Sequence, residues 1–132
     1  MKNTLIRLLL VTLAAAVVIG CRPTQPVYNV SNASVVASTG QNVTQNQVKQ
    51  AITRAGAGLG WVMRDQAPGH IVGTLNLRQH MAMVDIKYDA KSYSITYRDS
   101  QQLNYADGQI HQNYNGWVQN LQQAINTQLN LL

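Results

Sequence analysis

Side chains that could do chemistry are few in this chain of 132 residues. It has one cysteine, Cys21, three histidines, and five acidic residues that are all aspartates. None of the histidines, His70, His80 and His111, has a second histidine or a cysteine at the spacing that is typical of a zinc site. We therefore expect neither a metal site nor a cofactor.

Asp85 and His80 are close enough in the sequence to suggest a catalytic dyad. Asp85 lies on the polar side of the alternating segment 82–88. The chain has no G-x-S-x-G nucleophile, no glutamate and no second cysteine to complete such a site. An exposed aspartate on a strand explains the same pattern. We therefore expect a protein that is not an enzyme, with a cryptic hydrolase as an alternative.

Cys21 follows a segment that is typical of a secretory signal peptide. Lys2 and Arg7 precede an uncharged apolar run from Leu8 to Ile19. This run has about 12 residues, whereas a helix that spans a bilayer needs about 20. Because Cys21 is the only cysteine, it cannot form a disulfide within the chain. The sequence therefore predicts export and a different role for the cysteine.

The segment Val18-Ile19-Gly20-Cys21 resembles the lipobox of bacterial lipoproteins, in which leucine is commoner than valine at the first position. This resemblance covers residues 1–21. It implies that residues 1–20 are a signal peptide and that Cys21 carries acyl chains such as palmitate, which anchor the protein to a membrane. Arg22 stands where aspartate would retain a lipoprotein in the inner membrane. For a Gram-negative source, the resemblance therefore implies the periplasmic leaflet of the outer membrane.

Cleavage before Cys21 would leave 132 minus 20, or 112, residues, which suffice for one domain. We expect residues 21–26, with Pro23 and Pro26, to form an extended lipidated tether and residues 27–132 to form the domain. Loss of Lys2 and Arg7 lowers the formal net charge from +5 to +3. The remaining cations are scattered, which argues against a nucleic-acid partner.

Two segments have the apolar spacing of amphipathic helices. Thr44-Gln45-Asn46-Gln47 fits a capping box, and the first helix should end between residues 56 and 60. Its predicted apolar stripe is Val48, Ala51, Ile52, Ala55 and Leu59. The stripe of the second helix is Trp117, Val118, Leu121, Ala124, Ile125 and Leu129.

The remaining segments have the patterns of strands and turns. Strands are expected within residues 27–36, 61–64, 71–77, 82–88 and 93–98. The inward-facing residues change from odd to even numbers after Leu77, and a hairpin at Arg78-Gln79-His80 explains this better than a β-bulge in one very long strand. Tyr88 and Tyr93 should face each other across the next turn.

This order of elements predicts an α+β fold of two layers, with two helices packed on one face of a mainly antiparallel sheet of about four strands. The domain is similar to uncharacterised small lipoproteins of Gram-negative envelopes, which carry Gly-Trp after a first helix and Tyr-Asn-x-Trp before a second one. Here these are Gly60-Trp61 and Tyr114-Asn115-Gly116-Trp117. The likeness supports fold and compartment but brings no catalytic residues. We expect both tryptophans to be largely buried.

Met81 and Met83 should point away from the helices if Ala82 and Val84 point toward them. Exposed methionines can form an adaptable contact surface. We therefore expect a non-catalytic binding or assembly module, with an envelope protein or another envelope macromolecule as its partner. Its binding surface would comprise Arg78, Met81, Met83 and Lys87. A carrier of a small apolar ligand between helices and sheet is an alternative, and the tyrosines are an alternative contact surface.

Overall fold

The computed structural model describes residues 23–132, so Cys21 and the signal-peptide segment lie outside the described residues. In chain order, the described part consists of β1 (Thr24–Pro26), β2 (Val30–Ser34), α1 (Gln45–Gly58), β3 (Val62–Ala67), β4 (His70–Leu77), β5 (His80–Tyr88), β6 (Ser92–Gln101), β7 (Gln109–His111) and α2 (Gln112–Asn130). No helix among these is long and apolar enough to cross a bilayer.

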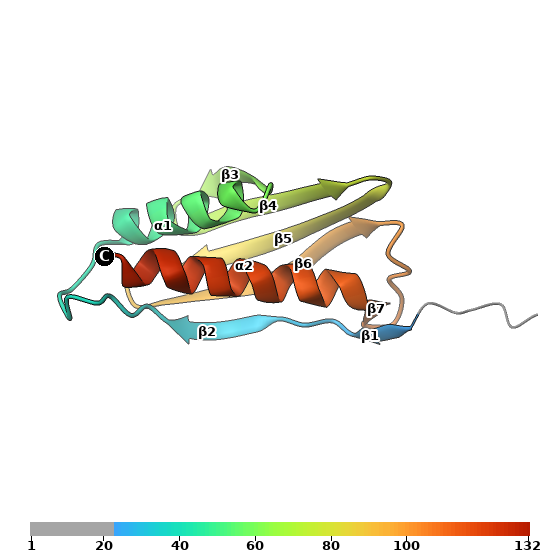
Figure 1. Cartoon of the computed structure of the whole chain (residues 1–132), viewed down its shortest axis with the longest axis horizontal. Coiled ribbons are helices and arrows are strands. Elements are labelled where there is room, and N and C mark those ends of the chain that lie inside the picture. Colours follow the sequence, from blue (N-terminus) through green and yellow to red (C-terminus); the bar gives the residue numbers. More distant parts are fainter. Residues whose placement is uncertain (1–22) are drawn as a thin grey trace, which may run out of the picture.

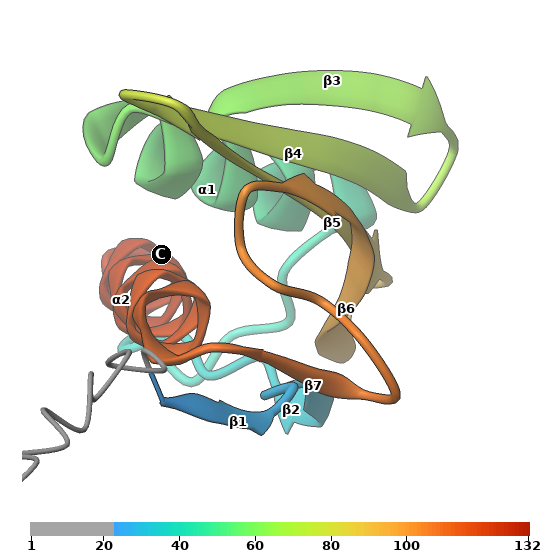
Figure 2. The ribbon, with the colours of Figure 1, turned by 90° about the vertical axis from the view of Figure 1, so that its right-hand side faces the viewer.

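Five strands form one antiparallel sheet in the order β2-β6-β5-β4-β3, and β1 pairs with β7 in a separate two-stranded sheet. Both helices lie on the same face of the five-stranded sheet, and α2 runs along most of the molecule (Figures 1 and 2). The predicted α+β class with two layers is confirmed. The main sheet has five strands instead of about four, and the β1-β7 pair was not predicted.

Helix α1 begins with the predicted capping box. The Thr44 hydroxyl accepts from the Gln47 backbone N–H at 3.1 Å, and the Gln47 side chain accepts from the Thr44 backbone N–H at 2.8 Å. The helix ends at Gly58, and Leu59 is its C-cap. Leu59 was expected in the buried stripe, but it is 43% exposed because the helical spacing does not continue to it.

The hairpin between β4 and β5 is confirmed. Leu77 pairs with His80 across a two-residue turn, in which Arg78 has a positive φ of 57°. The pairing sets Gly73 opposite Val84, so odd residues of β4 and even residues of β5 point toward the helices. Tyr88 and Tyr93 also pair as predicted.

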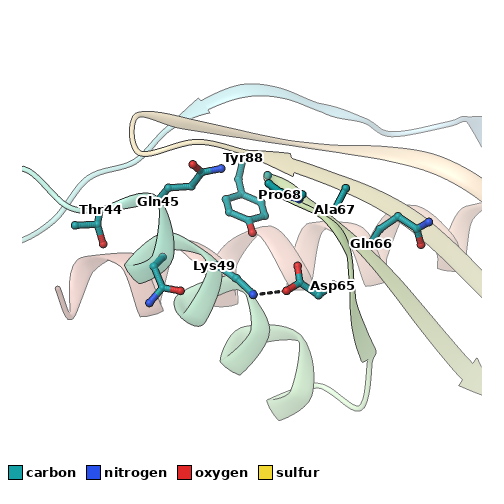
Figure 3. Close-up of a pocket in the computed structure, with 10 residues that line it drawn as sticks. Thr44, Gln45, Lys49, Asp65, Gln66, Ala67, Pro68 and Tyr88 are labelled. Atoms are coloured by element: carbon teal, nitrogen blue, oxygen red, sulfur yellow. Dashed lines mark ion pairs between the residues drawn. The ribbon is translucent and has the colours of Figure 1, made fainter.

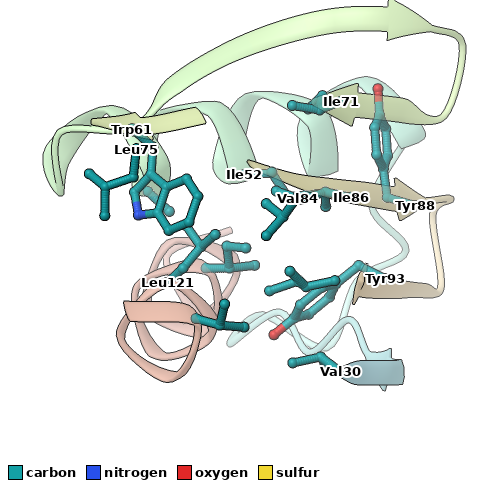
Figure 4. Packing of buried hydrophobic residues seen from close by; sticks show 14 of the residues in the cluster. Val30, Ile52, Trp61, Ile71, Leu75, Val84, Ile86, Tyr88, Tyr93 and Leu121 are labelled. Atoms are coloured by element: carbon teal, nitrogen blue, oxygen red, sulfur yellow. The ribbon is translucent and has the colours of Figure 1, made fainter. Parts of the chain in front are cut away.

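The core lies between the helices and the sheet, as Figure 4 shows. Trp61 is 4% exposed and packs in this core, which confirms its predicted burial. Trp117 is half-buried and packs against this core, so its predicted burial is confirmed only in part. It lies in the second turn of α2, where it shares a surface hollow with Gln25 and its ring is 6.3 Å from the ring of His80.

Half of the expected tether belongs to the fold. Thr24 pairs with His111 and Gln25 pairs with Ile110 in the β1-β7 ladder. The Pro26 carbonyl also accepts from the Asn115 side-chain amide at 2.9 Å. Prolines are compatible with this strand because its ladder has only three residue pairs and lies at the edge of the molecule.

Candidate functional site

Within residues 23–132, no element covers the face of the five-stranded sheet that points away from the helices (Figure 2). The strand register arranges the side chains of this face in rows, two of which run across β3, β4 and β5. One row runs across Val62, Thr74 and Met83, and the next across Arg64, Val72 and Asp85. Val62 is 54% exposed, so an apolar side chain of β3 remains in contact with solvent.

Met81 and Met83 point to this uncovered face, as predicted. Their neighbours Ala82 and Val84 are completely buried, whereas both methionines are only half-buried. Met83 pairs with Thr74 on β4 and with Asp99 on β6. The alternation along β5 therefore places two flexible apolar side chains where no helix packs.

Met83 lines a hollow of about 430 Å³ on this face. We call it the Met83 hollow, and it is lined by Val62, Arg64, Gln66, Val72, Thr74, Asn76, Met83 and Arg98. Arg64 is exposed and makes no ion pair within the described residues. The hollow thus combines three apolar side chains, Val62, Val72 and Met83, with the Arg64 guanidinium group, which can donate hydrogen bonds to a carboxylate.

The other three residues of the predicted surface do not line this hollow. Met81 pairs with Asn76, which does line it. Arg78 is in the hairpin turn at one end of β5. Lys87 is near the other end of the same strand, opposite His70, and lines a different hollow with Ser94. Met81 and Met83 therefore lie on the same face of β5, whereas Arg78 and Lys87 lie near opposite ends of this strand.

Asp85 is bonded to His70 and not to His80. Its Oδ1 atom accepts from His70 Nε2 at 2.6 Å and from Arg98 Nη1 at 2.8 Å. Partial burial acts to raise the pKa of Asp85, but the hydrogen bonds from His70 and Arg98 outweigh it and lower the pKa below its usual value. A carboxylate held by two basic groups is a poor general base. The predicted alternative of a dyad with His80 is wrong.

His80 and His111 each have a structural role elsewhere. His80 Nδ1 donates to the Gln102 carbonyl at 2.8 Å. His111 is the N-cap of α2 and its Nδ1 accepts from the Asn113 N–H at 3.1 Å. Neither is hydrogen-bonded to Asp85, and residues 23–132 contain no group of three side chains that could hold a metal ion.

A larger hollow, of about 630 Å³, lies between the first turn of α1 and the turn that joins β3 to β4 (Figure 3). Lys49 and Asp65 form an ion pair across it. The hydroxyl of Tyr88 points toward this pair, and burial raises the pKa of Tyr88, as does the nearby Asp65 carboxylate. The sequence did not predict this site, because the contact between Lys49 and Asp65 depends on how α1 packs against β3.

The tyrosines mainly belong to the core. Tyr88, Tyr93 and Tyr114 are buried, and burial raises the pKa of Tyr93 to about 12. Tyr97 is half-buried and stacks on the exposed Tyr105 with ring centroids 4.1 Å apart. Among the six tyrosines, all of which lie in residues 23–132, Tyr105 is the only one that is exposed.

Comparisons of the chain with protein-family models, with curated proteins and with solved structures find no match.

Proposed function

We propose that the chain is the precursor of a membrane-anchored envelope lipoprotein, and that its domain is a non-catalytic module that binds another envelope protein through the Met83 hollow. One observation carries the proposal. Both helices pack on one face of the sheet, and the other face keeps apolar side chains in contact with solvent around an arginine that makes no ion pair within residues 23–132.

The chemistry of the hollow defines the partner. An apolar side chain of the partner would pack against Met83 and Val72, since methionine adapts to irregular surfaces. A partner carboxylate would bind Arg64, whose planar group can form two parallel hydrogen bonds. Arg98 is already bonded to Asp85, so we assign it to the wall of the hollow.

The two alternatives have less support. A carrier would need space between the helices and the sheet, but fully buried side chains of both layers, such as Ile52, Ile86 and Leu121, fill that region. A hydrolase would need a free base beside a nucleophile. Asp85 is held by His70 and Arg98, and the described histidines do not meet in one cleft.

With the proposed lipid anchor, a small contact area would be sufficient for binding a partner. Lipidation of Cys21, in the periplasmic leaflet of the outer membrane of a Gram-negative cell, would hold the domain at the membrane surface. A tethered module meets a partner in the same envelope at a raised effective concentration. A hollow of about 430 Å³ can therefore serve without the large interface that a free partner in solution would require.

Site-specific photo-cross-linking in cells tests the proposal. A photoreactive phenylalanine derivative replaces Thr74, which lines the hollow, or Gln123, which is exposed on α2. We expect a protease-sensitive adduct of defined mass from position 74 and none from position 123. The adduct should disappear when Arg64→Glu is added. Equal adducts from both positions, or adducts only at position 123, would refute the Met83 hollow as the binding site.

A further inference from the structure

We infer that the end of the domain that carries β1 lies against the lipid bilayer, with Trp117 at the level of the lipid headgroups. We call this surface the anchor end and define it by Gln25, Leu77, Arg78, Tyr105 and Trp117. The inference rests on the proposed lipid anchor at Cys21 and adds the orientation that the fold would impose on the anchored domain.

Covalent geometry places the anchor close to this end. Thr24 is paired with His111 in the β1-β7 ladder and is only three positions after Cys21 in the sequence. Three residues reach at most about 10 Å, even when fully extended. Acyl chains on Cys21 would therefore hold β1 next to the membrane surface. The connection would be too short to let the domain rotate freely.

The surface around β1 is continuous. Gln25 and Trp117 line one hollow of about 370 Å³. The Trp117 ring is 6.3 Å from the ring of His80, which pairs with Leu77 at the β4-β5 turn. The loop 102–108, which connects β6 to β7, lies at the same end of the molecule (Figure 1).

The side chains of the anchor end suit a bilayer interface. Leu77 is 45% exposed and Tyr105 is 47% exposed, although both are large and apolar. Arg78 is exposed at the tip of its hairpin, and Trp117 is half-buried. Tryptophan, tyrosine and arginine combine an apolar body with a polar tip, and they are favoured where hydrocarbon meets headgroups.

Charge does not oppose this contact. Arg78 belongs to the anchor end and Arg22 directly follows Cys21, while Asp107 is an acidic residue of the adjoining loop. The local balance is therefore slightly positive, which suits a leaflet with some anionic lipid. A partner protein is a different occupant of the same surface, and the experiment below separates it from lipid.

This contact would orient the whole domain. Helix α2 runs from the anchor end to the opposite end, where the C-terminus lies (Figure 1). With the anchor end on the membrane, the long axis of the domain would stand away from the bilayer. The Met83 hollow would then face sideways, open to a neighbouring envelope protein.

Fluorescence quenching by lipid tests the inference on the mature protein, after cleavage and lipidation. The protein is purified from the membrane, its modification at Cys21 is measured by mass spectrometry, and it is placed in phosphatidylethanolamine–phosphatidylglycerol vesicles that contain brominated lipid. The chain has two tryptophans, and Trp61 lies in the core at 4% exposure. Contact of Trp117 with the interface should therefore quench up to about half of the emission.

Two variants make the result specific. Trp117→Phe should abolish the quenching, because only Trp61 remains. Leu77→Ser should reduce it, whereas Leu131→Ser should not, since Leu131 is 74% exposed at the opposite end of α2. Thermal unfolding of each variant, followed by circular dichroism, verifies that the fold is intact.

The outcomes separate the inference from the proposed anchor. Protein that carries acyl chains but shows no quenching of Trp117 would refute the orientation and leave the anchor in place. Quenching equally reduced by Leu77→Ser and Leu131→Ser would also refute it. Mature protein without acyl chains would refute the anchor, and the inference with it.

Discussion

Two tyrosine hydroxyls in the core differ in their hydrogen bonding. The Tyr93 hydroxyl donates to the Asn126 side chain at 2.6 Å. The Tyr114 hydroxyl is buried and has no hydrogen-bond partner within the described residues. Burial raises the pKa of both groups, so both remain protonated at neutral pH.

Removal of the two hydroxyls should therefore have opposite effects. Tyr114→Phe removes a buried polar group without a partner and should leave the free energy of unfolding unchanged or raise it by about 1 kcal/mol. Tyr93→Phe leaves the Asn126 side chain without its donor and should lower the free energy of unfolding by about 0.5–1.5 kcal/mol. Urea unfolding at pH 7 measures both. A larger loss for Tyr114→Phe than for Tyr93→Phe would contradict this account of the core.

Asp85 gives the domain a stability that depends on pH. Its pKa in the folded state is lowered, so its contribution is complete above the unfolded value of about 3.9 and is lost as the pH falls through the folded value. Asp85→Asn should lower the free energy of unfolding by about 1–3 kcal/mol at pH 7. The difference from the parent should shrink below about pH 4.

Urea unfolding at several pH values checks this prediction. Asp107→Asn is the matched control, because Asp107 is exposed and makes no ion pair within residues 23–132. If Asp85→Asn behaves like Asp107→Asn at pH 7, then the contacts with His70 and Arg98 do not stabilise the fold.

At the scale of elements, α1 contains two glycines in different surroundings. A Cβ at Gly58 would meet nothing within 4 Å. A Cβ at Gly56 would overlap the Met63 side chain, which packs against the helix from β3. Close packing against Met63 therefore explains a glycine at position 56, whereas no contact requires a glycine at position 58.

Replacing each of these two glycines with alanine should separate the effect of helix propensity on stability from the effect of packing. Gly58→Ala should raise the free energy of unfolding by about 0.5–1 kcal/mol, because glycine is a poor helix former. Gly56→Ala should raise the free energy of unfolding by less than this or lower it, since Met63 must move to make room. Thermal unfolding of the two variants provides the comparison, and an equal gain in both would show that α1 does not pack closely on β3.

Local patterns predicted most of the elements correctly. The Thr44 capping box, the change of parity after Leu77 and the pairing of Tyr88 with Tyr93 depend on neighbours in the sequence, and the structure has all three. The β1-β7 ladder could not be predicted in this way. Its three pairs join residues that are 83, 85 and 87 positions apart, and neither segment has a strand pattern of its own.

The candidate site was predictable only in part. The outward direction of Met81 and Met83 follows from alternation along one strand. The neighbours of Met83 in the hollow, such as Arg64 and Val72, come from β3 and β4, and the register of three strands brings them together. For the same reason the sequence suggested His80 as a possible partner of Asp85 but gave no sign of His70 and Arg98, which lie on the adjacent strands β4 and β6.

At the scale of the whole molecule, the domain has a covered and an uncovered face, together with one end beside the proposed anchor. The sole cysteine precedes this end by three residues. We predict that Cys21→Ser gives a full-length precursor without acyl chains. Metabolic labelling with a fatty-acid probe measures this, and a variant that is still labelled would contradict the lipid anchor.

The central claim is that the uncovered sheet face around Met83 binds a partner protein, and the most direct measurement is the yield of the photo-adduct from position 74 in a Met81→Ser/Met83→Ser background. Both methionines are half-buried on the face away from the core, so the double variant should fold, as its thermal unfolding would verify. We predict that the folded variant loses most of the adduct. An undiminished yield from the folded variant would contradict the claim.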